Sequence, residues 1–172
     1  DNTISVPLPD GELSLALTSR IERAAGDFTW IGQGSGEGGQ TVLVVRGNQI
    51  TGVIYDGFVQ YSITPLGGDL HAMTKVNHAA FPPDHPPGPL PRAPRSPDRR
   101  SDIPGKTTAG GVEIDVLGVY TPEAAAANAN IENAIQLAID MANAAYIASN
   151  ADVELRLVGT MLASGYSEAG KT

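Results

Sequence analysis

The chain has 172 residues, a formal net charge of −8, 41% hydrophobic and 17% charged residues, and no cysteine. The length allows one or two domains, and the excess of acidic residues argues against a general nucleic-acid binder, which needs Lys and Arg to neutralise phosphates. The missing cysteine excludes disulfides and thiol catalysis, and no apolar run is long enough to span a bilayer, so we expect neither nucleic acid nor membrane as a partner.

The first eighty residues alternate between β-branched runs and turn signals. The candidate strands are residues 3–8, 13–21, 28–31, 41–46, 50–55, 58–66 and 69–76. Two-residue turns at Gly47-Asn48, Asp56-Gly57 and Gly67-Gly68 separate the last four strands. Tight hairpins need positive φ, which these residue types supply, and we expect type I′ geometry at Asp56-Gly57. Residues 1–80 are therefore predicted to form an antiparallel β-meander domain.

Residues 34–39 satisfy the dinucleotide-binding pattern GxGxxG. The pattern leads into the candidate strand 41–46, whereas a phosphate-binding loop leads into a helix. We therefore expect a flexible hairpin loop and no dinucleotide site.

Residues 81–110 form a candidate linker. Nine of the thirteen prolines lie between Pro82 and Pro104, together with several arginines. Such a segment is extended and solvated and does not join a packed core. Its dibasic pair, Arg99 and Arg100, is a possible activation cleavage site. The alternative is that the arginines only keep the linker soluble.

Residues 111–172 are predicted to form a strand, a helix and a second strand. Residues 112–120 are rich in β-branched side chains, and residues 152–158 alternate between polar and apolar. Between them Thr121 is a good N-cap, Pro122 suits the first helical position, and Asn150 is a left-handed stop. We predict one long helix between two parallel strands with a right-handed crossover. The fold class is α+β, with a β-meander domain, a Pro-rich linker and an incomplete β-α-β unit.

Candidate chemistry is sparse. The histidines are His71, His78 and His85, none is followed by Glu, and all precede residue 111. We interpret them as ordinary polar positions. Two carboxylate pairs, Glu113 with Asp115 and Asp152 with Glu154, lie on the two candidate strands. Parallel pairing would bring them together for acid–base work, but we favour a solvated strand end.

Two regions of the sequence carry a family resemblance. They comprise residues 29–32, 52–54, 61–63 and 68–71 in the first half, and 114–122, 143–146, 155–159 and 166–168 in the second. Both resemble secreted bacterial metzincin-type zinc metalloproteases, and they are most similar to peptidyl-Asp metalloendopeptidases. The resemblance implies a pro-region over residues 1–80, a linker over 81–110, and a truncated start of the catalytic domain over 111–172.

The resemblance also implies what this chain lacks. A metzincin binds zinc through an HExxHxxGxxH segment, and none is present. We therefore assign no catalytic, cofactor-binding or metal-binding residue and expect this chain alone to be inactive. The complete enzyme is expected to hold zinc, to act on protein or peptide substrates, and to be secreted or periplasmic. Partners would include the remainder of the catalytic domain.

Three questions stay open from the sequence. The chain begins with Asp1, so we expect a precursor that has lost its export signal, or a trimmed chain. A pro-region without cysteine must secure latency through a carboxylate, a histidine or steric cover. The rival interpretation is a non-catalytic extracellular binding module, with a β-meander domain and a small α/β docking unit.

Overall fold

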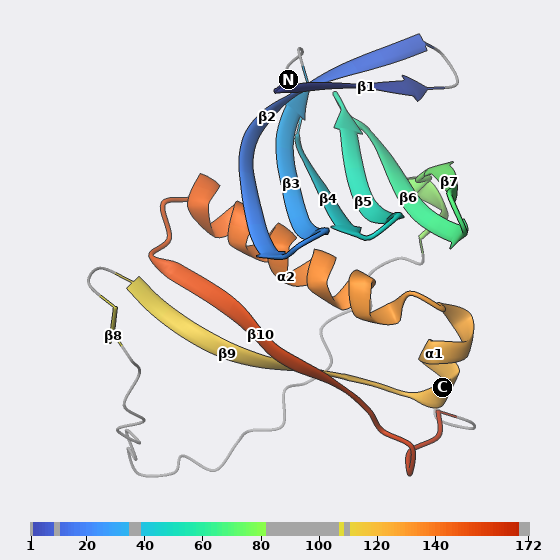
Figure 1. The fold of residues 1–172 in the computed structure, drawn as a ribbon, viewed down its shortest axis with the longest axis vertical. Helices are drawn as coiled ribbons and strands as arrows, with labels where there is room; N and C mark the ends of the chain where they lie inside the picture. The colour runs from blue at the N-terminus through green and yellow to red at the C-terminus, as the bar shows by residue number, and fades with distance from the viewer. Residues whose placement is uncertain (1, 9–10, 35–38, 82–106, 109–110, 169–172) are drawn as a thin grey trace.

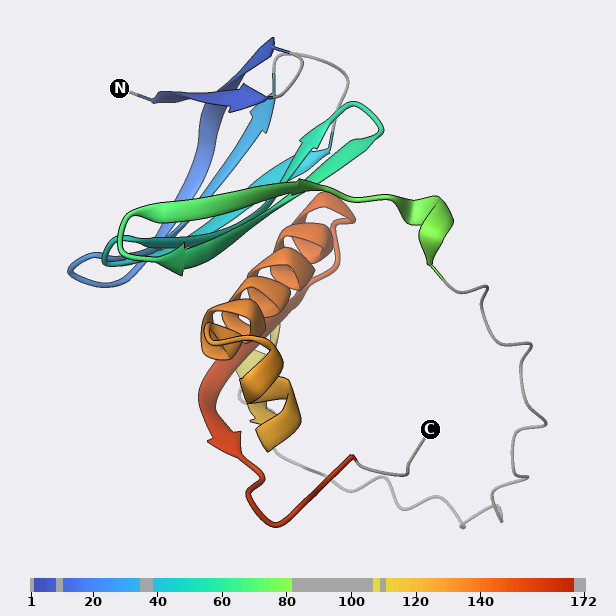
Figure 2. The ribbon, with the colours of Figure 1, turned by 90° about the vertical axis from the view of Figure 1, so that its right-hand side faces the viewer.

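A computed structural model describes residues 2–8, 11–34, 39–81, 107–108 and 111–168. One long helix, α2 (Ile131–Ala148), lies between a curled seven-stranded sheet and a three-stranded sheet (Figures 1 and 2). The described part is mostly β-structure, so it agrees only loosely with the predicted α+β class.

The large sheet is an antiparallel meander whose strands lie side by side in chain order. Its strands are β1 (Thr3–Leu8), β2 (Gly11–Ala24), β3 (Asp27–Gly34), β4 (Gln40–Arg46), β5 (Gln49–Asp56), β6 (Val59–Gly67) and β7 (Leu70–Lys75), and a short 3-10 helix, His78–Ala80, follows. Each neighbouring pair is antiparallel, so the predicted meander is confirmed. Pro7 fits within β1 because β1 is an edge strand, where one side needs no backbone donor.

The hairpin turns depend on glycine, but not with the expected turn type. Asp56 and Val59 pair directly, so Gly57 and Phe58 are the central residues of that turn. Gly57 has a φ of 59°, and Phe58 is not among the residues with positive φ. Positive φ at the first central residue alone is the pattern of a type II′ turn, so the predicted type I′ turn was wrong. The predicted hairpin between β5 and β6 is confirmed.

The two faces of the large sheet pack against different partners. On one face the sheet curls over itself and encloses a core of Leu13, Leu15, Trp30, Leu43, Ile54 and Tyr61. On the other face Ile31, Val42, Val44 and Val53 pack against Leu137 and Ala144 of α2. The alternation of side chains along β3, β4 and β5 thus supplies two cores from one sheet.

The small sheet has the order β10-β9-β8. Its strands are β8 (Thr107–Thr108), β9 (Gly111–Tyr120) and β10 (Val153–Leu162). Strands β9 and β10 are parallel, as predicted, while the short β8 is antiparallel to β9 and was not anticipated. Strand β8 belongs to the small sheet although it falls within the predicted linker 81–110. The division into domains at residues 80 and 111 stays a prediction.

The predicted single helix is in fact two. The first, α1 (Pro122–Ala127), begins as expected, because the Thr121 hydroxyl accepts a hydrogen bond from the Ala124 amide. It ends at Asn128, whose extended backbone lets its side chain accept from the amide of Asn130 at 2.9 Å. Asparagine side chains compete with helical hydrogen bonds in this way, which explains the break.

The end of α2 was predicted correctly. Asn150 has a φ of 51°, and the amide of Ala151 donates back to the Tyr146 carbonyl at 2.9 Å. This is the Schellman arrangement that a left-handed residue after a helix allows.

The small sheet has an open edge and an exposed apolar face among the described residues. Strand β9 pairs with β8 only at Gly111 and Val112, so most of that edge has no neighbouring strand among the described residues. Its outer face also carries exposed apolar side chains, with Leu117 and Val119 each 52% exposed. An open edge beside an apolar face is a site where further structure is expected to bind. That the β-α-β unit is incomplete stays a prediction.

The β5–β6 turn yields the first testable prediction. Gly57→Val places a β-branched side chain at φ 59°, so we expect a loss of roughly 1 kcal/mol or more in unfolding free energy. Phe58→Val is the matched control, because Phe58 is fully exposed in the same turn and lacks positive φ. Thermal or urea unfolding of the whole chain measures both. Equal midpoints for the two variants would contradict the turn geometry.

Candidate functional site: the polar interface between helix α2 and the large sheet

The interface begins with an apolar strip. Thr29, Val44 and Thr51 lie opposite one another on β3, β4 and β5, and Ile31, Val42 and Val53 form the next row. Leu137, Met141 and Ala144 of α2 pack on these rows. Their spacing of three and four residues places them on one side of the helix.

A buried carboxylate lies in the middle of this strip. Asp140 is 4% exposed and extends from α2 toward β3. Its Oδ2 accepts from the Thr29 hydroxyl at 2.5 Å, and its Oδ1 accepts from the Gln136 amide at 3.0 Å. Burying a carboxylate is strongly unfavourable unless hydrogen bonds and a cation compensate it.

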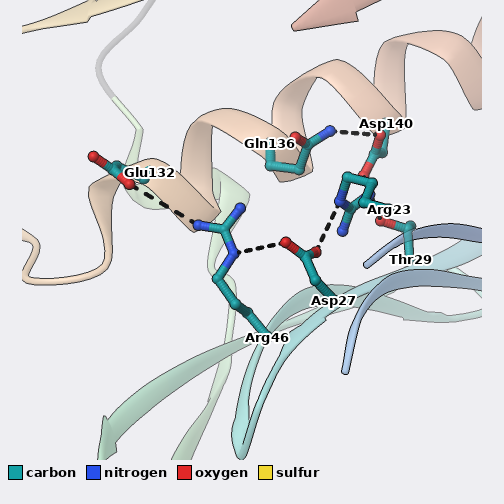
Figure 3. Close-up of polar contacts among 7 residues, drawn as sticks. All are labelled: Arg23, Asp27, Thr29, Arg46, Glu132, Gln136 and Asp140. Carbon is teal, nitrogen blue, oxygen red and sulfur yellow. Dashed lines mark hydrogen bonds and ion pairs between the residues drawn. The ribbon is translucent and has the colours of Figure 1, made fainter. Parts of the chain in front are cut away.

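The cation is Arg23, near the end of β2. Its Nη1 lies 2.8 Å from the Thr29 hydroxyl and 3.4 Å from Asp140 Oδ2. Its Nε donates to Asp27 at 2.8 Å, and Asp27 also accepts from Arg46 (Figure 3). Arg46 reaches Glu132 of α2 at 4.0 Å, at the exposed rim. Two sheet arginines therefore contact the carboxylates of one helix.

The opposite side of α2 has a different character. Ile135 lies so close to Gly118 of β9 that a β-carbon there would approach the Ile135 Cγ2 to 2.7 Å. The Asn143 side chain donates to the Leu155 carbonyl at 2.8 Å and accepts from the Leu155 amide at 2.7 Å. The Asn143 amide thus pairs with both backbone groups of Leu155, as the backbone of a neighbouring strand would, and this pairing joins the helix to β10.

The two histidines that the structure describes, His71 and His78, make local contacts. His71 is held within the large sheet, where its Nε2 accepts from the Ile50 amide at 2.9 Å. His78 stacks edge-on against Phe81. Within the described residues no group of three His, Cys, Asp or Glu side chains is placed to hold a metal ion. His85, Arg99 and Arg100 lie outside the described residues.

The strand carboxylates are paired with an arginine that the sequence reading did not consider. Glu113 and Asp115 share the outer face of the small sheet, and Arg156 of β10 contacts them at 2.9 Å and 2.7 Å. Glu113, Asp152 and Glu154 also line a surface hollow of about 410 Å³ with Ile21 and Ile147. These two ion pairs join β9 to β10, and the side chains of Arg156 and Asp115 are more than half exposed. That these carboxylates mark a solvated strand end and not an acid–base site stays a prediction.

The carboxylate of Glu123 has a lowered pKa. The Ser167 hydroxyl donates to Glu123 at 2.7 Å, and this hydrogen bond lowers the pKa of Glu123, with help from backbone amides. Its small contribution to stability is therefore present at neutral pH and lost as the pH falls through the lowered pKa. Glu123 is the first acidic residue of α1, so the contact fastens residues 167 and 168 to that helix end.

Comparison with known proteins gives a consistent relationship. No protein-family model matches the chain, and no solved structure matches it significantly. Over 93% of its length it is 31% and 30% identical to two proteins from Stenotrophomonas maltophilia, each named peptidyl-Asp metalloendopeptidase. A protein of the same name from Xanthomonas campestris pv. campestris is 27% identical over 94% of the chain. The chain is thus similar to proteins named as metalloendopeptidases. It spans 42% of the length of each of these relatives.

The buried carboxylate gives the second prediction. Asp140→Ala removes the buried carboxylate that accepts from both Arg23 and Thr29, so we expect a loss of about 1–3 kcal/mol in unfolding free energy. Glu132→Ala is the control, because Glu132 is half exposed and its contact with Arg46 is long; exposed pairs contribute about 0–1 kcal/mol. Urea unfolding of the whole chain tests both. A control as damaging as Asp140→Ala would contradict the assignment of Asp140 as the centre of the interface.

Proposed function

We propose that this chain is the N-terminal part of a secreted or periplasmic zinc metalloendopeptidase precursor of the metzincin type. Residues 1–80 are the pro-region, 81–110 the activation linker and 111–172 the start of the catalytic domain. The observation that carries the proposal is the extent of the similarity, which covers 93% of this chain and 42% of the first relative. Such a match includes both sheets and the segment between them.

The shared core supports a folding role for the pro-region. Helix α2 needs cover on two sides, and the large sheet provides one of them through Ile31, Val42, Val44 and Val53. A strand–helix–strand unit of about sixty residues buries too little surface to be stable alone. The seven-stranded sheet thus offers a template on which the unit folds.

The unfinished small sheet supports the remainder of the catalytic domain as the partner. The open edge of β9 offers backbone donors and acceptors, and Leu117 and Val119 offer an apolar face. The residues described here do not fit a catalytic zinc ion, since they contain no suitable ligand group. We therefore assign zinc and its chemistry to the remainder, which would also bind the protein substrate.

Latency and activation complete the proposal. Cleavage in the linker, with Arg99 and Arg100 as the candidate pair, would separate the pro-region from the catalytic part. No cysteine is available to bind zinc, so latency rests on a carboxylate, a histidine or steric cover.

The reading frame tests the assignment directly. An HExxHxxGxxH segment downstream of the codon for Thr172 is expected. A stop codon at that position would contradict the proposal and favour the non-catalytic binding module. The pro-region role has its own test, in which residues 1–80 are deleted from the complete precursor. We expect less soluble, active enzyme, and an unchanged yield would contradict the folding role.

The third prediction concerns this chain by itself. Because its sequence contains no HExxH segment, we expect no zinc-dependent cleavage of a denatured protein substrate by the purified 172-residue chain. The assay adds zinc, with a chelator as control. Cleavage that the chelator abolishes would overturn our interpretation of the histidines.

A further inference from the structure

The two sides of α2 indicate different kinds of attachment. Toward β9 and β10 the helix makes close apolar contact at Gly118 and a two-bond clamp from Asn143 to the backbone of Leu155. Toward the large sheet the helix combines the apolar Leu137 and Ala144 with the buried polar pair Gln136 and Asp140. Exposing such a mixed side to water costs less than exposing an entirely apolar one.

We propose that the large sheet is a detachable docking surface for α2. Arg23 and Thr29 select the helix by donating hydrogen bonds to the Asp140 carboxylate. This deepens the proposed function, on which it rests, by naming the partner of the pro-region. After the linker is cut, residues 1–80 stay bound to the C-terminal piece without a covalent link and leave it reversibly.

The contacts supply the binding part of this inference. The contacts that carry this interface come from β2, β3, β4 and β5 on one side and from α2 on the other. None involves residues 82–106, so cutting there removes no contact described above. The covalent linker only raises the effective concentration of the two pieces near each other. After the cut, the complex is therefore expected to persist at micromolar protein concentration.

The specificity comes from charge. An apolar strip accepts many amphipathic helices, but the carboxylate of Asp140 is placed between a Thr29 donor and the Arg23 guanidinium. A helix without that carboxylate would leave both groups facing an apolar surface, which opposes binding. Arg23 also stays fixed when the helix is absent, because Asp27 holds its Nε.

The reversibility comes from composition. Interfaces between proteins that separate are more polar than obligate ones, and part of the present one consists of Thr29, Arg23, Gln136 and Asp140. The core that keeps the large sheet folded lies on its other face, around Leu15, Trp30 and Ile54. Loss of α2 therefore leaves that core intact.

The experiment uses the whole chain with a site-specific protease sequence in place of residues 92–98. Before cutting, circular dichroism and thermal unfolding confirm that each variant is folded. After cutting, analytical ultracentrifugation over a dilution series gives the dissociation constant of the two pieces. Emission of Trp30, the single tryptophan, reports the far-side core of the large sheet during separation.

The wild-type pieces are expected to remain together at micromolar concentration and to separate on dilution, with Trp30 emission unchanged. Asp140→Ala should weaken their affinity by about thirtyfold or more, while the rim variant Glu132→Gln should change it less than about threefold. Asp140→Asn keeps the shape without the charge and should lie between them. It replaces Asp140→Ala if the latter fails to fold uncut.

Three results would overturn the inference. The first is separation of the wild-type pieces even at high micromolar concentration. The second is equal affinity for the Asp140 and Glu132 variants. The third is a change in Trp30 emission that accompanies separation, which would mean one indivisible core. None of these results bears on the reading-frame test, so the precursor assignment stands or falls separately.

Discussion

The fold depends on the burial of α2 on two opposite sides. A surface helix normally buries one apolar stripe and exposes the rest. Here Leu137 and Ala144 pack against the large sheet, while Ile135 and Asn143 contact the small sheet. The helix is the only described element with extensive contacts to both sheets. Any change that removes one sheet exposes half of the helix.

This constraint explains why a carboxylate is tolerated inside the interface. Asp140 is surrounded by a hydroxyl, an amide and a guanidinium, all on elements that other contacts hold in place. Arg23 itself is held by Asp27 within the large sheet, independently of the helix. Polar groups in such a place add little net stability but penalise wrong pairings strongly. That balance suits a contact between a folding template and its client.

Local physical chemistry made much of the fold predictable. Gly47, Gly57 and the alternating β-branched runs identified the meander, because turns and strands are determined by neighbouring residues. Thr121 and Asn150 likewise marked helix ends through backbone geometry that a short sequence specifies. The break near Asn128 was missed because a strong alanine propensity on both sides outweighed a weak local signal.

The interface was not predictable in the same way. Arg23 and Asp140 are 117 positions apart, and each alone looks like an ordinary exposed charge. Asn133, Gln136 and Asp140 form a polar stripe at helical spacing, which sequence analysis normally assigns to solvent. Only the packing of a second sheet on that stripe makes it an interior surface. The ion pair between Arg156 and Asp115 was also not predicted, because it depends on the register between β9 and β10.

The central claim is that the large sheet holds α2 and the small sheet in their folded form. Amide hydrogen exchange on the whole chain, and on residues 111–172 alone, tests it most directly. In the whole chain we predict strong protection along α2 and at Val116 and Leu157, and in the isolated piece we predict that protection falls to the level of a molten state. Strong protection of Val116 and Leu157 in the isolated piece would show a domain complete without the sheet and would contradict the account.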